Sequence, residues 1–121
     1  MGYPVIRLHA DRQHGLTTAL LDVALANARR GKRVAFCSPT PRECEYSARA
    51  ALDLIVGDDA VSSVSHVNGA KAVFYANGGA VSFLRDRPDD RDGFDVEVYD
   101  SGPDGSAEIV RPREVVRDAR R

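Results

Sequence analysis

The fold is decided by residues 5–40, which run VIRLHADRQHGLTTALLDVALANARRGKRVAFCSPT. Residues 4–10 alternate apolar and polar side chains, as a half-buried strand does. Residues 15–30 are rich in Ala and Leu on more than one face, which predicts a helix packed against a sheet. The run 33–37 is typical of a short buried strand. Strand, helix and strand in this order predict a right-handed crossover in an α/β fold.

The ends of two helices carry local signals. Gly31 follows the first helix and favours the C′ position, where a left-handed backbone is common. Thr40 is a candidate N-cap for a second helix that runs to about residue 55. Pro41 then takes the first helical position, and Glu43 stands at capping-box spacing from the cap.

The rest of the chain predicts mainly strands. Further strands are expected at residues 61–67, 72–76, 80–84, 95–100 and, as a last edge strand, 107–110. The Asn77-Gly78 pair between two of these runs predicts a β-hairpin. The charged residues 85–95 favour a solvated loop. We therefore expect a minimal P-loop-type three-layer α/β sandwich, with a mainly parallel sheet and an added hairpin.

Composition narrows the class of protein. The chain has 121 residues, 43% apolar and 29% charged, with a net charge of -1. This is a globular profile, and it argues against a disordered chain or a strongly basic nucleic-acid binder. We expect one domain over residues 1–110 and an arginine-rich tail over 111–121. Apolar runs are shorter than the roughly 20 residues of a membrane span, and no signal peptide is visible, so we expect a cytoplasmic protein without membrane contact.

Residues 10–18, ADRQHGLTT, occupy the position of a phosphate loop between strand and helix. That loop has the pattern G-x-x-x-x-G-K-[ST], in which backbone amides and Lys hold phosphates and the hydroxyl binds magnesium. Gly15 and Thr17 match the second glycine and the hydroxyl. Ala10 stands in place of the first glycine, and Leu16 in place of the lysine.

Three further stretches carry a family resemblance. They are GKRVAFCSPT at residues 31–40, VFYANGG at 73–79 and DGFDVEVYD at 92–100. In this order and spacing the chain resembles, over residues 4–102, the ATPase domain of phage terminase large subunits and related helicase-type P-loop ATPases. The resemblance implies that the chain is phage-encoded and that Asp100 corresponds to the Walker B acid.

The chain also departs from that family at positions that matter for chemistry. Leu16 removes the phosphate-binding lysine, and Ser101 replaces the Walker B glutamate that would polarise water. Asp92 precedes Gly93 where the family has arginine, and the chain ends where the family continues. Because hydrolysis needs the phosphate charge neutralised and the water oriented, we expect no ATP turnover.

The candidate site is therefore a weak anion site. Arg12, Gly15, Thr17 and Thr18 are its candidate residues, at the N-terminus of the first helix. Asp100 would coordinate magnesium with Thr17 only when a nucleotide brings the metal, and no other cofactor is expected. The plain alternative is a strand-to-helix turn, with Asp100 as a strand-end carboxylate and Leu16 as an apolar plug.

Three functions stay open from the sequence. The leading hypothesis is a non-hydrolytic, ATPase-like phage accessory protein that binds a protein partner or itself. The second is a nucleotide-binding or ATPase module completed by residues of another chain. The third is a nucleic-acid-binding accessory protein that uses the tail 111–121. An open sheet edge after the Walker B strand favours a homodimer or a covering tail.

Overall fold

The computed structural model describes most of the chain. It covers residues 5–9, 16–67, 69–85, 88, 92–100 and 106–110, with the side chains of 5–9 and 106 left undescribed. The elements are β1 (Val5–His9), α1 (Leu16–Arg29), β2 (Arg33–Cys37), α2 (Pro41–Leu54), β3 (Val61–Ser65), β4 (Ala72–Tyr75), β5 (Ala80–Leu84), β6 (Val96–Asp100) and β7 (Ser106–Val110). The class is α/β, as predicted.

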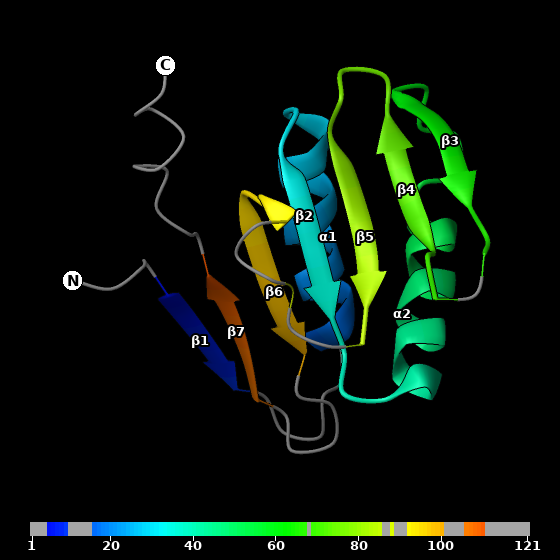
Figure 1. Ribbon diagram of the computed structural model, residues 1–121. Helices are drawn as coiled ribbons and strands as arrows, with labels where there is room; N and C mark the ends of the chain where they lie inside the picture. Colours follow the sequence, from blue (N-terminus) through cyan, green and yellow to red (C-terminus); the bar gives the residue numbers. More distant parts are fainter. Residues whose placement is uncertain are drawn as a thin grey trace.

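The strands form one seven-stranded sheet in the order β1-β7-β6-β2-β5-β4-β3 (Figure 1). Only the centre is parallel, because β2 pairs in parallel with β5 and with β6. The other four pairings are antiparallel. The prediction of a mainly parallel sheet is therefore wrong. The connections from β3 to β4, β4 to β5 and β6 to β7 contain no helix among the described residues, and short connections produce antiparallel neighbours.

The described elements form two layers instead of the predicted three. Both helices lie on one face of the sheet, behind it in Figure 1, and they contact each other. The reason lies in the strand order. β1, β2 and β3 all point the same way, and the chain moves in one direction along the sheet from β1 to β2 and from β2 to β3. Two right-handed crossovers in the same direction place their helices on the same face.

A single hydrophobic core fills the space between the sheet and the helices. The alternating burial of β5 places Val81 and Phe83 toward the helices. From α1 the core receives Leu20 and Leu21, both fully buried. Each such side chain contributes about 1.5–3 kcal/mol through burial. This core holds α1 against the carboxyl end of β6, where the candidate site lies.

The last carbonyls of α1 are capped by the turn that follows the helix and by the β4–β5 hairpin. Gly31 has φ of +94°, and its N–H donates to the carbonyl of Ala28 at 2.9 Å, while Lys32 N–H reaches Asn27 at 3.1 Å. This is the Schellman pattern, and it confirms the C′ prediction. The side chain of Asn77 adds a hydrogen bond from Nδ2 to the carbonyl of Arg29 at 2.7 Å. The predicted hairpin is confirmed, and its asparagine also caps the helix.

The N-terminus of α2 begins as predicted. Thr40 is the N-cap, and its hydroxyl accepts from Glu43 N–H at 3.2 Å. Pro41 is the first helical residue. These two features define the start of α2.

The position of β7 corrects a second prediction. β7 lies between β1 and β6 and is not an edge strand. Among the described strands the two edges are β1 and β3, so that the sheet continues past β6 on the side where an open edge was expected. Residues 111–121 lie outside the described part of the chain, and the predicted domain boundary stays a prediction.

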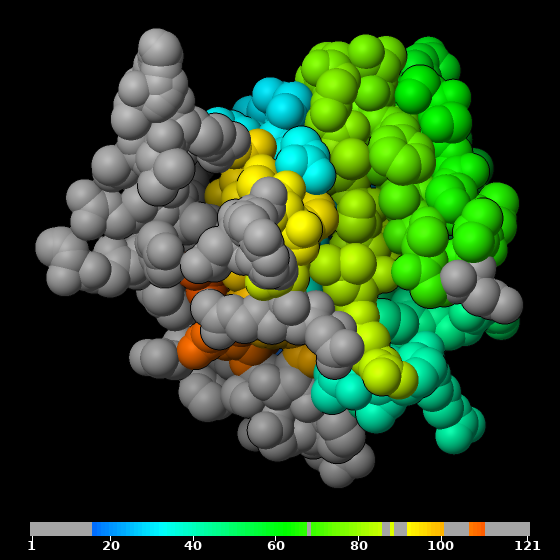
Figure 2. Space-filling model, in the orientation of Figure 1, coloured from blue at the N-terminus to red at the C-terminus, as the bar shows by residue number. Residues whose placement is uncertain are grey.

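The face of the sheet opposite to the helices is partly exposed (Figure 2). Phe74 of β4 is 40% exposed on this face. At the start of β2 the guanidinium of Arg33 donates to the carbonyls of Asp92 at 2.9 Å and Gly93 at 3.2 Å, and it lies 4.9 Å from the ring centroid of Phe94. Residues 92–94, at the end of the predicted solvated loop 85–95, are therefore held against β2 by Arg33.

Candidate functional site

Two residues of the predicted site meet at the N-terminus of α1. Thr17 lies in the first turn of α1, and Asp100 is the last residue of β6. They are 83 positions apart, yet Thr17 Oγ1 donates to Asp100 Oδ2 at 2.8 Å. Asp100 is 7% exposed, and Thr17 is half-buried. The pair places a hydroxyl and a carboxylate together at the carboxyl end of the central sheet.

Leu16 begins α1 one position before this pair. Its side chain is 6% exposed and belongs to the hydrophobic core. An apolar group therefore packs inward at the position where the phosphate-loop pattern has an ammonium. Lys neutralises phosphate charge and a leucine cannot, so this helix start lacks the principal cation of a phosphate loop.

The other predicted site residues are only partly placed. Thr18 is exposed on α1. Arg12 and Gly15 lie outside the described residues, as do Ala10 and Ser101, so the predicted anion site around them stays a prediction.

Ser38 is a polar group that the sequence analysis did not single out. It follows β2 and is 3% exposed. Its N–H continues the ladder to Leu84 at 2.9 Å, while its hydroxyl has no hydrogen-bond partner within the described structure. The β2–β6 register pairs Cys37 with Tyr99, so Ser38 and Asp100 come next on neighbouring strands. Two sequence signals mark it: Ser38 directly follows a buried strand, and it lies in the stretch 31–40 that carries part of the family resemblance.

The pair is compatible with one kind of metal chemistry. Carboxylate and hydroxyl oxygens are ligands that Mg²⁺ accepts, usually together with waters and substrate phosphates. The described residues contain no group of three or more His, Cys, Asp or Glu side chains that would hold a metal without such help. Thr17 and Asp100 therefore suit a metal that arrives with a phosphate ligand.

The shifted pKa values lie at the opposite end of α1. Arg29 donates a hydrogen bond to Asp58, which lowers the pKa of that carboxyl; the N–H of Ala60 lowers it further. The same bond raises the pKa of Arg29. Burial raises the pKa of Tyr75, which lies beside this pair. This charge pair links α1 to the turn before β3, so its role is in the packing of the fold.

Comparisons with protein-family models, with curated proteins and with solved structures find no match to this chain. Neither described helix is long and apolar enough to cross a membrane.

Proposed function

We propose that this chain is a P-loop ATPase-like domain, related to the terminase and helicase ATPases, that does not hydrolyse ATP by itself. It acts by binding a protein partner or a second copy of the chain. On this proposal the protein is phage-encoded and works in the cytoplasm of the host cell.

The contact between Thr17 and Asp100 carries this proposal. The two residues stand in separate motifs: Thr17 matches the loop hydroxyl, and the family resemblance aligns Asp100 with the Walker B acid. In P-loop proteins these two groups together hold the magnesium of the nucleotide. A separation of 2.8 Å between their oxygens is the arrangement that such a pair needs. A chance strand-to-helix turn would not require these two positions to meet.

The absence of hydrolysis is proposed from two other positions. Leu16 packs into the core and supplies no positive charge for the terminal phosphates. Ser101 has no carboxylate to orient the attacking water. Phosphoryl transfer depends on positioning and on charge stabilisation, so the loss of both groups removes most of the catalysis.

A second candidate function rests on the same pair. Thr17 and Asp100 retain the oxygen ligands of a magnesium site, so a cation and a general base from another chain would restore an ATPase. This candidate differs from the first in its concentration dependence, because a site shared between chains forms only when the chains associate.

Phosphate release tests both candidates. The purified chain is incubated with ATP and Mg²⁺ over a hundredfold range of protein concentration, and Thr17→Ala serves as the control. The proposal expects release at the background rate at every concentration. Release that rises more steeply than the protein concentration and is abolished by Thr17→Ala would support the shared site. Release proportional to concentration and abolished by Thr17→Ala would contradict both.

Self-association is measured separately. Light scattering over the same concentrations distinguishes a dimer from a monomer. A dimer supports binding to a second copy, and a monomer at all concentrations leaves the protein partner as the proposed ligand.

A further inference from the structure

A cavity lies between the first turn of α2 and the sheet, where β5 ends. We call it the α2–β5 cavity, and its volume is about 500 Å³. Pro41, Phe83 and Leu84 give it apolar walls, and Glu45, Lys71 and Arg85 are its charged residues. Sites for small organic molecules are usually about 300–1,000 Å³ and mostly apolar, with a few polar groups that orient the ligand. The α2–β5 cavity has both properties.

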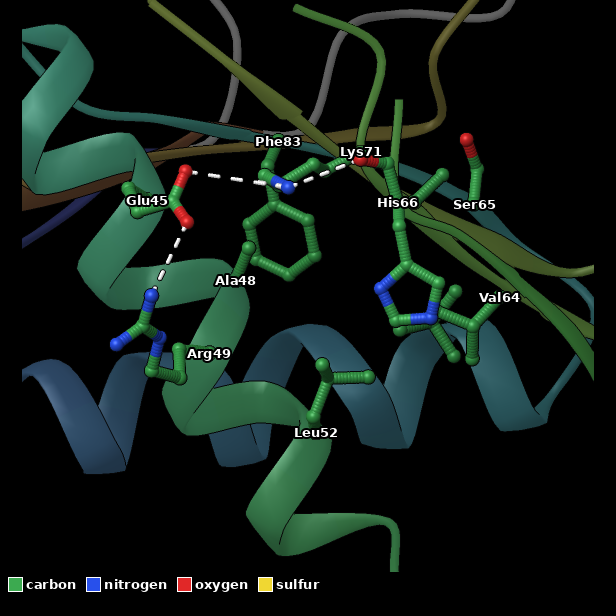
Figure 3. Close-up of a pocket in the computed structure, with 11 residues that line it drawn as sticks. Glu45, Ala48, Arg49, Leu52, Val64, Ser65, His66, Lys71 and Phe83 are labelled. Atoms are coloured by element: carbon green, nitrogen blue, oxygen red, sulfur yellow. Dashed lines mark hydrogen bonds and ion pairs between the residues drawn. The ribbon is translucent and has the colours of Figure 1, made fainter. Parts of the chain in front are cut away.

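A smaller cavity of about 160 Å³ adjoins it beneath α2 (Figure 3). Ala48, Leu52 and Val64 are among its apolar lining residues, and Arg49, Ser65 and His66 are among its polar ones. The two cavities share Phe83, Glu45 and Lys71. Figure 3 shows the Lys71 ammonium between Glu45 and the carbonyl of His66. The smaller cavity therefore offers further apolar contacts next to the charged residues that the two cavities share.

The apolar wall is fixed before any ligand arrives. Phe83 is 4% exposed, and its ring packs against Phe36 with centroids 5.8 Å apart. Its N–H donates to the carbonyl of Lys71 at 3.0 Å, which fixes the backbone that carries the ammonium. A preformed wall lowers the ordering cost of binding.

Positive charge exceeds negative charge around this wall. Glu45 is engaged by Arg49 at 3.3 Å and by Lys71 at 3.9 Å. Lys71 Nζ also donates to the carbonyl of His66 at 3.1 Å. An ammonium has three donors, so at least one stays available to a ligand. Arg85 makes no ion pair with the described residues, and its guanidinium suits an anionic head group.

We propose that the α2–β5 cavity binds a small organic anion with an apolar arm. The arm lies on Phe83 and extends toward the smaller cavity, while the anionic head lies between Lys71 and Arg85. The charge balance selects an anion over a cation, and the apolar walls select an arm of aromatic or acyl character. The site shares no residue with the Thr17–Asp100 pair and does not depend on the proposed function.

Anilinonaphthalene sulfonate is a suitable probe, because it joins an aromatic arm to an anionic head and fluoresces when bound. Titration into the full chain should show saturable binding with one site. Lys71→Gln and Arg85→Gln should each weaken it about tenfold, as the loss of a charge-assisted hydrogen bond does. Arg30→Gln removes an equal charge from an exposed residue that lines neither cavity and whose guanidinium donates to Asn27, and it should leave affinity unchanged.

Two further measurements separate this site from general adhesion of the dye. The uncharged analogue phenylnaphthylamine should bind the wild type and both variants alike, because the arm contacts remain. Cys44 lines the cavity and is half-exposed, whereas Cys37 is buried, so the bound probe should slow alkylation of Cys44. Absence of saturable binding, or equal affinity of the wild type, Lys71→Gln and Arg85→Gln, would overturn the proposal. Arg85 is exposed, so its variant keeps the test valid where Lys71→Gln fails to fold.

Discussion

Thr17→Val removes one hydroxyl and keeps the shape of the side chain. In the wild type that hydroxyl donates to Asp100 at 2.8 Å, and Asp100 is 7% exposed. A hydrogen bond to an ionised acceptor stabilises a protein by about 1.5–3 kcal/mol. We therefore expect the free energy of unfolding to fall by about 2 kcal/mol. At this chain length that corresponds to a Tm lower by about 8 °C.

A double-mutant cycle isolates the contact from the other effects of each substitution. Urea unfolding, followed by circular dichroism, is measured for the wild type, Thr17→Val, Asp100→Ala and the double variant. We expect a coupling energy of at least about 1 kcal/mol. Thr18→Val is the matched control, because Thr18 is exposed in the same turn and should couple to Asp100 by less than about 0.3 kcal/mol. If the free-energy losses of Thr17→Val and Asp100→Ala simply add in the double variant, the Thr17–Asp100 hydrogen bond does not stabilise the fold.

Two other predictions concern the far end of α1. Gly79→Ala would place a Cβ 1.8 Å from the carbonyl oxygen of Ala28, so denaturation should show that the free energy of unfolding falls by more than about 3 kcal/mol. Gly78→Ala is the control, because Gly78 has φ of +96° and no atom lies within 4 Å of the added Cβ. Its free energy of unfolding should fall by only about 1–2 kcal/mol. Arg29 lowers the pKa of Asp58 in the folded protein. The stability that the Arg29–Asp58 pair adds is therefore fully present above the ordinary carboxyl pKa, and it is lost as the pH falls through the lowered pKa of Asp58. The Tm difference between wild type and Asp58→Asn should stay constant from about pH 5 to 8 and shrink below about pH 4, and a difference unchanged down to about pH 2 would contradict this cause.

The helices and turns were predictable because their signals are local. Gly31 ends α1, and Thr40 with Pro41 begins α2, where the sequence predicted each event. The Asn77-Gly78 pair predicted the hairpin for the same reason, since a turn of this kind depends on the residues within it.

The arrangement of the sheet was less predictable. β7 enters between β1 and β6, and its partners are distant in sequence. Residues 106–110 alone do not distinguish an edge strand from an inner one. The strands that pair with this segment, and the residues that cover its two faces, come from other parts of the chain. The two-layer arrangement followed in turn from the strand order, which the sequence analysis did not predict.

The candidate site also has a part that the sequence predicts and a part that depends on the arrangement of distant segments. Thr17 and Asp100 lie within hydrogen-bond distance, and the sequence considers them together only through the family resemblance; their role as magnesium ligands stays a prediction. Ser38 was missed because its neighbours Pro39 and Thr40 signal a helix start and mask the buried hydroxyl. The α2–β5 cavity was missed because its lining comes from α2, from β5 and from the loop before β4, and no single stretch of sequence contains it.

Calorimetric titration shows whether the start of α1 has phosphate-loop geometry: ATP with Mg²⁺ is titrated into the wild type and into the double variant Leu16→Lys with Ala10→Gly. This variant restores the two residues that the phosphate-loop pattern requires. We expect the wild type to bind ATP with a Kd above about 1 mM, which corresponds to a binding free energy weaker than about 4 kcal/mol. The double variant should gain measurable affinity, and Thr17→Ala should then remove it. A folded double variant that binds ATP no better than the wild type would contradict the claim that this helix start is a disabled phosphate loop.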